Sequence, residues 1–269
     1  MRRVGLIGAG AIGIAVAQVL AAGRAPDIVL AAVLARPHQL DALRGALGGH
    51  VTVTAEPEAF LAADLEVVVE AAGHAAALAL APKVVAGGRD LILVSVGALA
   101  DRRFRDELLT AADCGAGRVL VPSGGFAGFD GLRALAQMGL TEVTYVSTKP
   151  PRAWDGTPGE ARIRRRGADE RVVLFDGEAG EAARSFPKNA NLAAAVAMAG
   201  LGFERTRVTL VSDPTEPDIV GALTARTAAT ILEVTTRNRP SEANPKSSQL
   251  VSGSVLAALA NARDALAFG

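Results

Sequence analysis

The sequence predicts an α/β protein in which a parallel sheet covered by helices is followed by a second, α+β domain. Three features support this: apolar runs that alternate with alanine-rich stretches, a glycine-rich string directly after the first run, and a change of pattern near residue 123. Continuous apolar strands that alternate with helices are typical of a parallel sheet buried on both faces. We therefore expect one domain at 1–123, a second at 124–245, and a last helix, 246–269, that returns to the first domain.

The elements of the first domain follow from this alternation. Runs rich in Val, Ile and Leu predict strands, and the stretches between them are long enough for helices. The predicted strands are Val4–Ile7, Ile28–Leu34, Val67–Val69, Leu91–Val94 and Val119–Val121, and the predicted helices are Ala11–Ala22, Leu40–Leu47 and Ala75–Ala86.

The pattern of the second domain is less regular. Four glycines cluster between 124 and 131, and a strand is predicted at Glu142–Lys149. The polar, Pro- and Arg-rich stretch Pro150–Arg171 predicts a loop or flap. An alanine-rich helix is expected at Leu192–Gly200, and Asn244–Ser248 is expected to cap the final helix.

The composition excludes several functions. Of the 269 residues, 50% are hydrophobic and 4% aromatic, and the formal net charge is +0. This balance predicts no nucleic-acid partner and no membrane partner. Cys114 is the single cysteine, which excludes an internal disulfide and a cysteine-rich zinc site, so we expect no metal. The N-terminus runs directly into an apolar strand without a signal sequence, which favours a cytoplasmic location.

The most informative motif is Gly8-Ala9-Gly10-Ala11-Ile12-Gly13, a G-x-G-x-x-G string that follows a strand and opens a helix. In this context the string predicts a Rossmann dinucleotide-binding domain. Gly8 permits the tight turn, Gly10 lets the backbone approach a pyrophosphate, and Gly13 lets the helix pack close to the strand. The N–H groups of the first helical turn, which includes Ala11 and Ile12, would face the phosphates. The alternative is a glycine-rich turn that binds nothing.

The end of the second strand indicates which nicotinamide cofactor binds. NAD enzymes usually carry an acidic residue there for the ribose 2′-hydroxyl. Here the strand runs into Ala35-Arg36-Pro37-His38, which contains no carboxylate. Arg36 stands where a guanidinium would bind a 2′-phosphate. We therefore expect NADP, with NAD as the alternative.

Other strand ends predict the nicotinamide site. The carboxyl ends of parallel strands line the ligand crevice of such sheets. Ala72 and Gly73 follow one strand, Ser95 and Gly97 follow the next, and Ser123 follows the last. We expect all five residues to contact the cofactor.

Three polar residues precede the alanine-rich helix of the second domain. Lys188, Asn189 and Asn191 stand at its start. One interpretation is that an asparagine caps the helix. The other is that the helix start, with the charge of Lys188, binds a substrate carboxylate. The sequence leaves both interpretations open.

Beyond the glycine motif, several unusual strings occur in a fixed order: Glu70–His74, Ser95–Asp101, Pro122–Gly125 with Asp130, Thr148–Pro151, Phe186–Asn191, Asp213-Pro214 and Asn244–Ser248. In these strings the chain resembles the L-aspartate dehydrogenase family over essentially its whole length. The resemblance implies a two-domain enzyme, often a dimer, that interconverts L-aspartate and iminosuccinate, or oxaloacetate plus ammonia, with NAD(P).

One departure concerns catalysis. Counted from Asp213-Pro214, the positions where the family pattern has an asparagine and a catalytic histidine are Ile219 and Gly221 here. A proton-transferring side chain is worth about 10²–10⁴-fold in rate. Three candidates could replace it: His74, at a strand end, Lys188, and the carboxylates Asp213, Glu216 and Asp218. A charge cluster in a turn is, however, usually a solvated face. At 221 we expect either empty space where an imidazole would sit or a different side chain that fills it. Filling by an apolar residue such as Ile219 would favour a less polar substrate.

The sequence therefore predicts an NADP-preferring oxidoreductase that transfers a hydride between nicotinamide and an amine or imine carbon, of L-aspartate or a related compound, in a homodimer. Two alternatives stay open: an NAD(P)-binding protein without catalysis, and an imine reductase with a less polar substrate. For the enzyme we expect His74, Ser95, Ser123 and Lys188 to surround one cleft.

Overall fold

The computed structural model describes residues 1–25, 27–167, 169–187, 189–241 and 244–261. The chain forms two compact units, one of Met1–Pro122 with the segment that starts at Val251, the other of Ser123–Leu250. The division into functional domains at residues 123 and 246, which the sequence predicts, stays a proposal. Within the described residues, none of the helices is both long and apolar enough to cross a bilayer.

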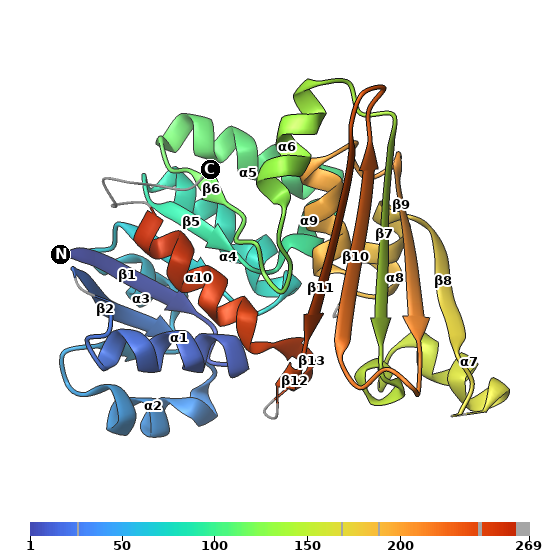
Figure 1. Ribbon diagram of the computed structural model, residues 1–269. Coiled ribbons are helices and arrows are strands. Elements are labelled where there is room, and N and C mark those ends of the chain that lie inside the picture. Colours follow the sequence, from blue (N-terminus) through green and yellow to red (C-terminus); the bar gives the residue numbers. More distant parts are fainter. Residues whose placement is uncertain (26, 168, 188, 242–243, 262–269) are drawn as a thin grey trace. The chain divides into compact units, whose positions relative to one another are not determined.

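The first unit contains a six-stranded parallel sheet in the order β3-β2-β1-β4-β5-β6 (Figure 1). This strand order is that of the Rossmann fold, so the predicted fold class is confirmed. Strand β3 was not predicted, because it has three residues and no apolar run. The strands are β1 (Arg2–Ile7), β2 (Ile28–Leu34), β3 (Thr52–Thr54), β4 (Val67–Glu70), β5 (Asp90–Leu93) and β6 (Val119–Leu120).

The core of this unit joins its sheet to helices from both ends of the described chain. Val4 and Val33 of the sheet and Val16 of α1 are fully buried in one cluster with Val255 and Leu259 of α10. The three predicted helices are found with ends that differ by one residue at most. The helices are α1 (Ala11–Ala21), α2 (Leu40–Leu47), α3 (Pro57–Leu61), α4 (His74–Ala86), α5 (Arg102–Gly115) and α10 (Gln249–Asn261), with 3-10 turns η1 (Pro37–Gln39) and η2 (Val96–Ala100).

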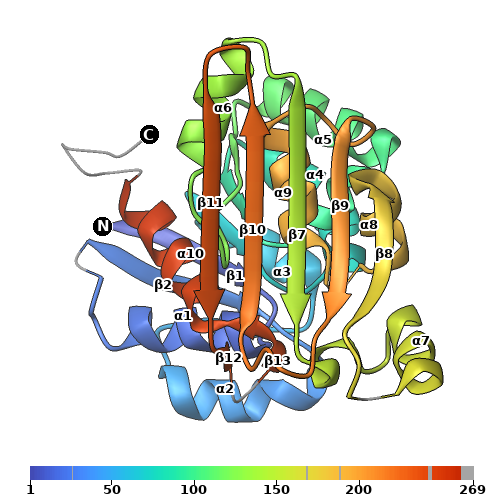
Figure 2. The same ribbon diagram turned by 45° about the vertical axis from the view of Figure 1, so that its right-hand side comes forward.

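The second unit contains a mixed five-stranded sheet in the order β11-β10-β7-β9-β8 (Figure 2). Strands β7 and β9 are parallel, and the other neighbours are antiparallel. Helices α6, α8 and α9 pack against this sheet. The elements are α6 (Phe129–Gln137), β7 (Glu142–Lys149), η3 (Pro151–Trp154), α7 (Pro158–Arg166), β8 (Val172–Glu178), α8 (Ala179–Ser185), α9 (Asn191–Ala199), β9 (Thr206–Ser212), β10 (Ile219–Arg226), β11 (Ile231–Asn238), β12 (Pro240–Ser241) and β13 (Asn244–Ser248).

The prediction of a loop or flap at Pro150–Arg171 was wrong, since this stretch contains η3 and α7. The side chain of Thr157 caps α7 by accepting a hydrogen bond from the N–H of Gly159 at 3.2 Å. Pro158 occupies the first helical position, which suits its fixed φ angle. The arginines at the other end of α7 complement the helix dipole. The prolines and arginines that suggested a loop are therefore helix-end signals.

The expectation that Asn244–Ser248 caps the final helix was also wrong. This segment is strand β13, which pairs antiparallel with β12, and α10 begins at Gln249. Ser248 lies directly before α10, and its buried Oγ has no hydrogen-bond partner among the described residues, so it does not cap the helix.

Candidate functional site

The glycine loop after β1 is shaped by two close backbone approaches. Gly8 has a φ of +102°, and a Cβ placed on it would lie 2.7 Å from Cα of Ala72. A Cβ on Gly13 would lie 2.1 Å from the carbonyl oxygen of Gly8. Around Gly10, the N-cap of α1, no described atom lies within 4 Å of the position that a Cβ would take, which leaves room for a ligand. The loop thus brings the start of α1 and its N–H groups close to the strand ends.

A cavity of about 520 Å³ lies at these strand ends, within the first unit. Its size is that of small-molecule sites. It joins four of the residues predicted to bind the cofactor, Gly8, Gly10, Arg36 and Ala72, whereas Ala11, Ile12, Gly13, Gly73, Ser95 and Gly97 lie outside its described lining. The carboxyl ends of β1, β2 and β4 therefore form a pocket, as the Rossmann topology requires of a dinucleotide site.

Arg36 is exposed at the end of β2 and is held toward the glycine loop. The Gln39 side chain accepts hydrogen bonds from the Arg36 backbone N–H at 3.3 Å and from its Nε at 3.4 Å. Gln39 in turn donates to the carbonyl of Ala9 at 2.8 Å. The described lining of the cavity contains no carboxylate. This edge therefore offers a cation, and its described lining holds no carboxylate for a ribose 2′-hydroxyl.

Glu70 holds two of the predicted cofactor loops in place through hydrogen bonds, the loop at Ala72-Gly73 and the loop at Ser95. The sequence analysis did not select it as a site residue. Its carboxylate is fully buried at the end of β4. Oε1 accepts from the N–H groups of Ala72 and Gly73 at 2.8 and 2.9 Å and from Oγ of Ser95 at 3.0 Å. Oε2 accepts from the N–H of Ser95 at 3.1 Å. Burial raises the pKa of Glu70, and these four hydrogen bonds oppose the rise.

We expect Glu70→Gln to lower the free energy of unfolding by about 1–3 kcal/mol, because the amide brings two N–H donors to a site that already holds four, whereas a protonated carboxyl brings only one O–H. The folded pKa of Glu70 is raised above 4.5, so the native carboxyl contributes its full stability below pH 4.5 and loses it as the pH rises through the folded value. The advantage over Glu70→Gln should therefore shrink between pH 5 and pH 8. Urea unfolding of both proteins at pH 5 and at pH 8 measures this difference in stability, and the exposed substitution Glu107→Gln is the control. A stability difference between the native protein and Glu70→Gln that grows with pH would contradict a raised pKa of Glu70.

The remaining predicted residues lie at element ends. His74 is the half-buried first residue of α4, and Gly73 before it has a φ of +114°. Ser95 and Gly97 are buried at the start of η2. Ser123 belongs to the second unit. Lys188 lies outside the described residues, so the expected cleft of His74, Ser95, Ser123 and Lys188 stays a proposal.

Two asparagines flank the start of α9. The N-cap is Ala190 and carries no side-chain cap, so the interpretation of Asn189 or Asn191 as the cap was wrong. Asn189 is buried, and its Nδ2 donates to the carbonyl of Ala153 at 3.0 Å. Its Oδ1 is also buried and has no hydrogen-bond partner among the described residues. Because a buried acceptor without a partner costs free energy, Oδ1 is a candidate contact for a bound ligand.

The surroundings of Gly221 are filled by two aromatic rings. Gly221 is buried in β10, and a Cβ there would lie 2.9 Å from Oη of Tyr145 and 3.0 Å from the ring of Phe126. These two rings pack edge to face with centroids 5.7 Å apart, and burial raises the pKa of Tyr145. Of the two expected outcomes, filling by another side chain is therefore the one found: Phe126 and Tyr145, and not Ile219, occupy the space in front of position 221.

We expect Gly221→His alone to lower the free energy of unfolding by about 1–3 kcal/mol, because the imidazole overpacks against Phe126. Phe126→Ala alone should cost about 3–5 kcal/mol. The double variant should cost less than the sum of the two, since the shortened side chain makes room for the imidazole. Urea unfolding of the three variants gives this coupling, with Ala222→His, on the opposite face of β10, as control. Strict additivity would show that the ring does not limit position 221.

Both parts of the chain match known families. Residues 130–262 match the family model "Aspartate dehydrogenase, C-terminal", and residues 8–122 match "Homoserine dehydrogenase, NAD binding domain". The chain is 40% identical to the L-aspartate dehydrogenase of Ralstonia pickettii and 39% identical to that of Cupriavidus taiwanensis, with 97% of each chain covered in both comparisons. The crystal structure of aspartate dehydrogenase from Thermotoga maritima has the same fold, with a TM-score of 0.78 at 24% identity and full coverage of both chains. The chain therefore belongs to the L-aspartate dehydrogenase family.

Proposed function

We propose that this protein, an NAD(P)-dependent oxidoreductase of the aspartate dehydrogenase type, prefers NADP and interconverts L-aspartate with iminosuccinate, or with oxaloacetate plus ammonia. Its relatives from Ralstonia pickettii and Cupriavidus taiwanensis are named L-aspartate dehydrogenases. The observation that carries the cofactor preference is the cavity at the glycine loop, with Arg36 at its edge and no described carboxylate in its lining.

The residues of this cavity fit a dinucleotide phosphate. The open space at Gly10 and the first turn of α1 suit a pyrophosphate, because helix N-termini attract anions. The guanidinium of Arg36 would bind the 2′-phosphate in two-pronged fashion. A bound nicotinamide would supply or accept the hydride. Glu70 positions Ser95 and the Ala72-Gly73 backbone, which we propose border the nicotinamide together with Gly97 and Ser123.

We propose that the start of α9 binds the substrate. Asn189 would accept an N–H of the amine or imine through Oδ1, which has no partner among the described residues. Lys188 and Asn191 would bind a carboxylate, a role supported by the charge of Lys188 and by the place of Asn191 as the first residue of α9. Such contacts orient the reacting carbon, and orientation supplies much of the rate in a transfer between two bound molecules.

We propose that this chain differs from the family pattern in its proton-transfer step. In this proposal Gly221 stands at the position of the family's histidine, and His74 or Lys188 moves the proton instead. The packing of Phe126 and Tyr145 at Gly221 favours a second candidate function, an imine reductase with a less polar substrate, because apolar rings do not satisfy a second carboxylate. We further propose a cytoplasmic homodimer, as the resemblance to the family implies.

Initial rates of NADP⁺ reduction test this proposal, measured with L-aspartate, L-glutamate, L-alanine and a cyclic amine. We expect L-aspartate to give the highest kcat/KM, and NADP⁺ to be preferred over NAD⁺. A higher kcat/KM for the cyclic amine selects the imine reductase. Absence of turnover with every substrate, in protein shown to bind NADPH, selects the binding protein without catalysis.

A further inference from the structure

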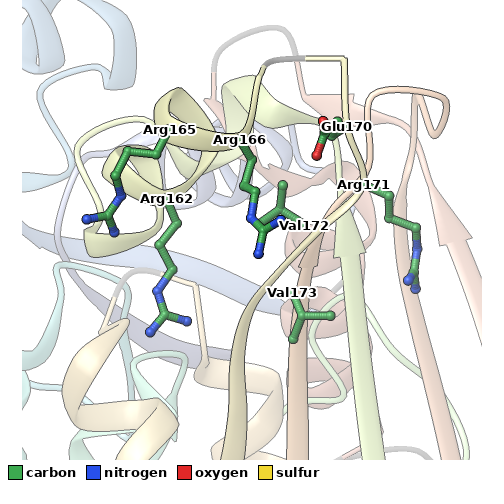
Figure 3. Close-up of a pocket in the computed structure, with 7 residues that line it drawn as sticks. All are labelled: Arg162, Arg165, Arg166, Glu170, Arg171, Val172 and Val173. Atoms are coloured by element: carbon green, nitrogen blue, oxygen red, sulfur yellow. The ribbon is translucent and has the colours of Figure 1, made fainter.

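A second cavity, of about 630 Å³, lies in the second unit, far along the sequence from the glycine loop. It is formed by the last turns of α7 and the start of β8 (Figure 3). Arg162, Arg165 and Arg166 of α7 line it, and so does Arg171, which directly precedes β8. In Figure 3 the side chains of Arg162, Arg165 and Arg166 lie on one side of the β8 ribbon, and that of Arg171 lies on the other. The cavity is large enough for a small-molecule ligand.

The charge of this cavity is strongly positive. Four arginines and a single carboxylate, Glu170, line it. None of the described carboxylates forms an ion pair with Arg162, Arg165 or Arg166, although Arg162 donates to the carbonyl of Leu174 at 2.7 Å. Arg171 is paired with Asp213 at 3.4 Å. Since like charges repel, gathering guanidinium groups around one hollow is favourable chiefly when an anion fills it.

The helix dipole accounts for only part of this cluster. Cations at the C-terminal end of a helix are stabilised by its dipole, and α7 ends in Arg164, Arg165 and Arg166. Arg171, however, lies beyond the helix and faces the same cavity. Arg164 shares the helix end but is paired with Glu160 and is not part of the lining. The dipole therefore does not explain which arginines line the hollow.

The chemistry of the lining selects the ligand. A guanidinium fork matches the oxygens of a phosphate and binds it in a two-pronged manner. Several separated guanidinium groups suit a chain of phosphates better than one phosphate ion. The protein as a whole has a formal net charge of +0, which does not favour a nucleic acid. The two valines of the lining, Val172 and the half-exposed Val173, add an apolar surface beside the charges.

We propose that this arginine cavity binds a chain of two or three phosphates, either free or as part of a nucleoside triphosphate. The phosphate chain lies among Arg162, Arg165, Arg166 and Arg171, and a nucleoside, where present, lies on Val173. The site is separate from the cofactor cavity, whose described lining belongs entirely to the first unit.

Isothermal titration calorimetry with tripolyphosphate and with ATP tests this, on protein that carries one equivalent of NADP⁺ so that the cofactor cavity is filled. We expect one binding site for tripolyphosphate. Arg165→Gln with Arg166→Gln should weaken binding at least tenfold, whereas Arg164→Gln, at the same helix end but outside the lining, should leave it within twofold. Melting temperatures of all variants show whether the helix is retained.

The two probes distinguish the sources of the phosphate chain. Equal affinity for tripolyphosphate and ATP assigns the site to the phosphates alone. Tighter ATP binding that Val173→Asp removes assigns it to a nucleotide. The proposal is overturned if tripolyphosphate does not bind, or if Arg164→Gln weakens binding as much as the double variant does.

Discussion

Gly13→Ala is expected to raise the Kd for NADPH at least about 100-fold, a loss of about 2.7 kcal/mol. The added methyl would lie 2.1 Å from the carbonyl oxygen of Gly8, and backbone at that distance has to move. The start of α1 would then separate from the loop, and the N–H groups that face the pyrophosphate would lose their positions. Fluorescence titration with NADPH measures the change in Kd.

Two other glycines of the same unit serve as controls. Gly45→Ala in α2 adds a methyl in open space, so it should leave NADPH binding unchanged and raise stability by up to about 1 kcal/mol. Gly10→Ala should keep the fold but weaken NADPH binding, because its methyl would enter the space left for the pyrophosphate. NADPH binding by Gly13→Ala with unchanged Kd would contradict the close packing at this turn.

Arg36→Ala is expected to raise the Kd for NADPH by about 10- to 100-fold, since a hydrogen bond to a charged group is worth about 1.5–3 kcal/mol. The Kd for NADH should stay within about twofold, because NADH lacks the 2′-phosphate that Arg36 would bind. Exposed Arg103→Ala, in α5 and outside the cavity lining, controls for the loss of one positive charge. Equal affinities for NADPH and NADH in the unmodified protein would contradict the assignment of Arg36.

Much of the first unit could be predicted because its elements are encoded locally. The apolar runs of β1, β2 and β4 appear as continuous stretches, and the string from Gly8 to Gly13 marks the turn between strand and helix. The strand-end rule then located the cavity region, including Gly10 and Ala72.

The features that sequence analysis missed depend on contacts between distant residues. Glu70 lies in one of the strings that resemble the family, but its role comes from its hydrogen bonds to Ser95, 25 positions away. Phe126 and Tyr145 pack against Gly221 from other segments of the second unit, and no local sequence pattern predicts this contact. Helix α7 was missed because its Pro and Arg content, which suits helix ends, is also common in loops.

The central claim is that this chain makes L-aspartate despite the glycine at position 221. Product analysis tests it most directly: oxaloacetate, ¹⁵N-ammonium and NADPH are incubated with the protein, and ¹⁵N-aspartate is quantified by mass spectrometry on a chiral column. The Ralstonia pickettii enzyme, assayed in parallel, sets the reference rate. Our account predicts ¹⁵N-L-aspartate, in amounts equal to the NADPH consumed, at a rate about 10²–10⁴-fold below the reference. Two results would contradict the account: oxidation of NADPH without formation of ¹⁵N-aspartate, or formation of ¹⁵N-aspartate at the reference rate.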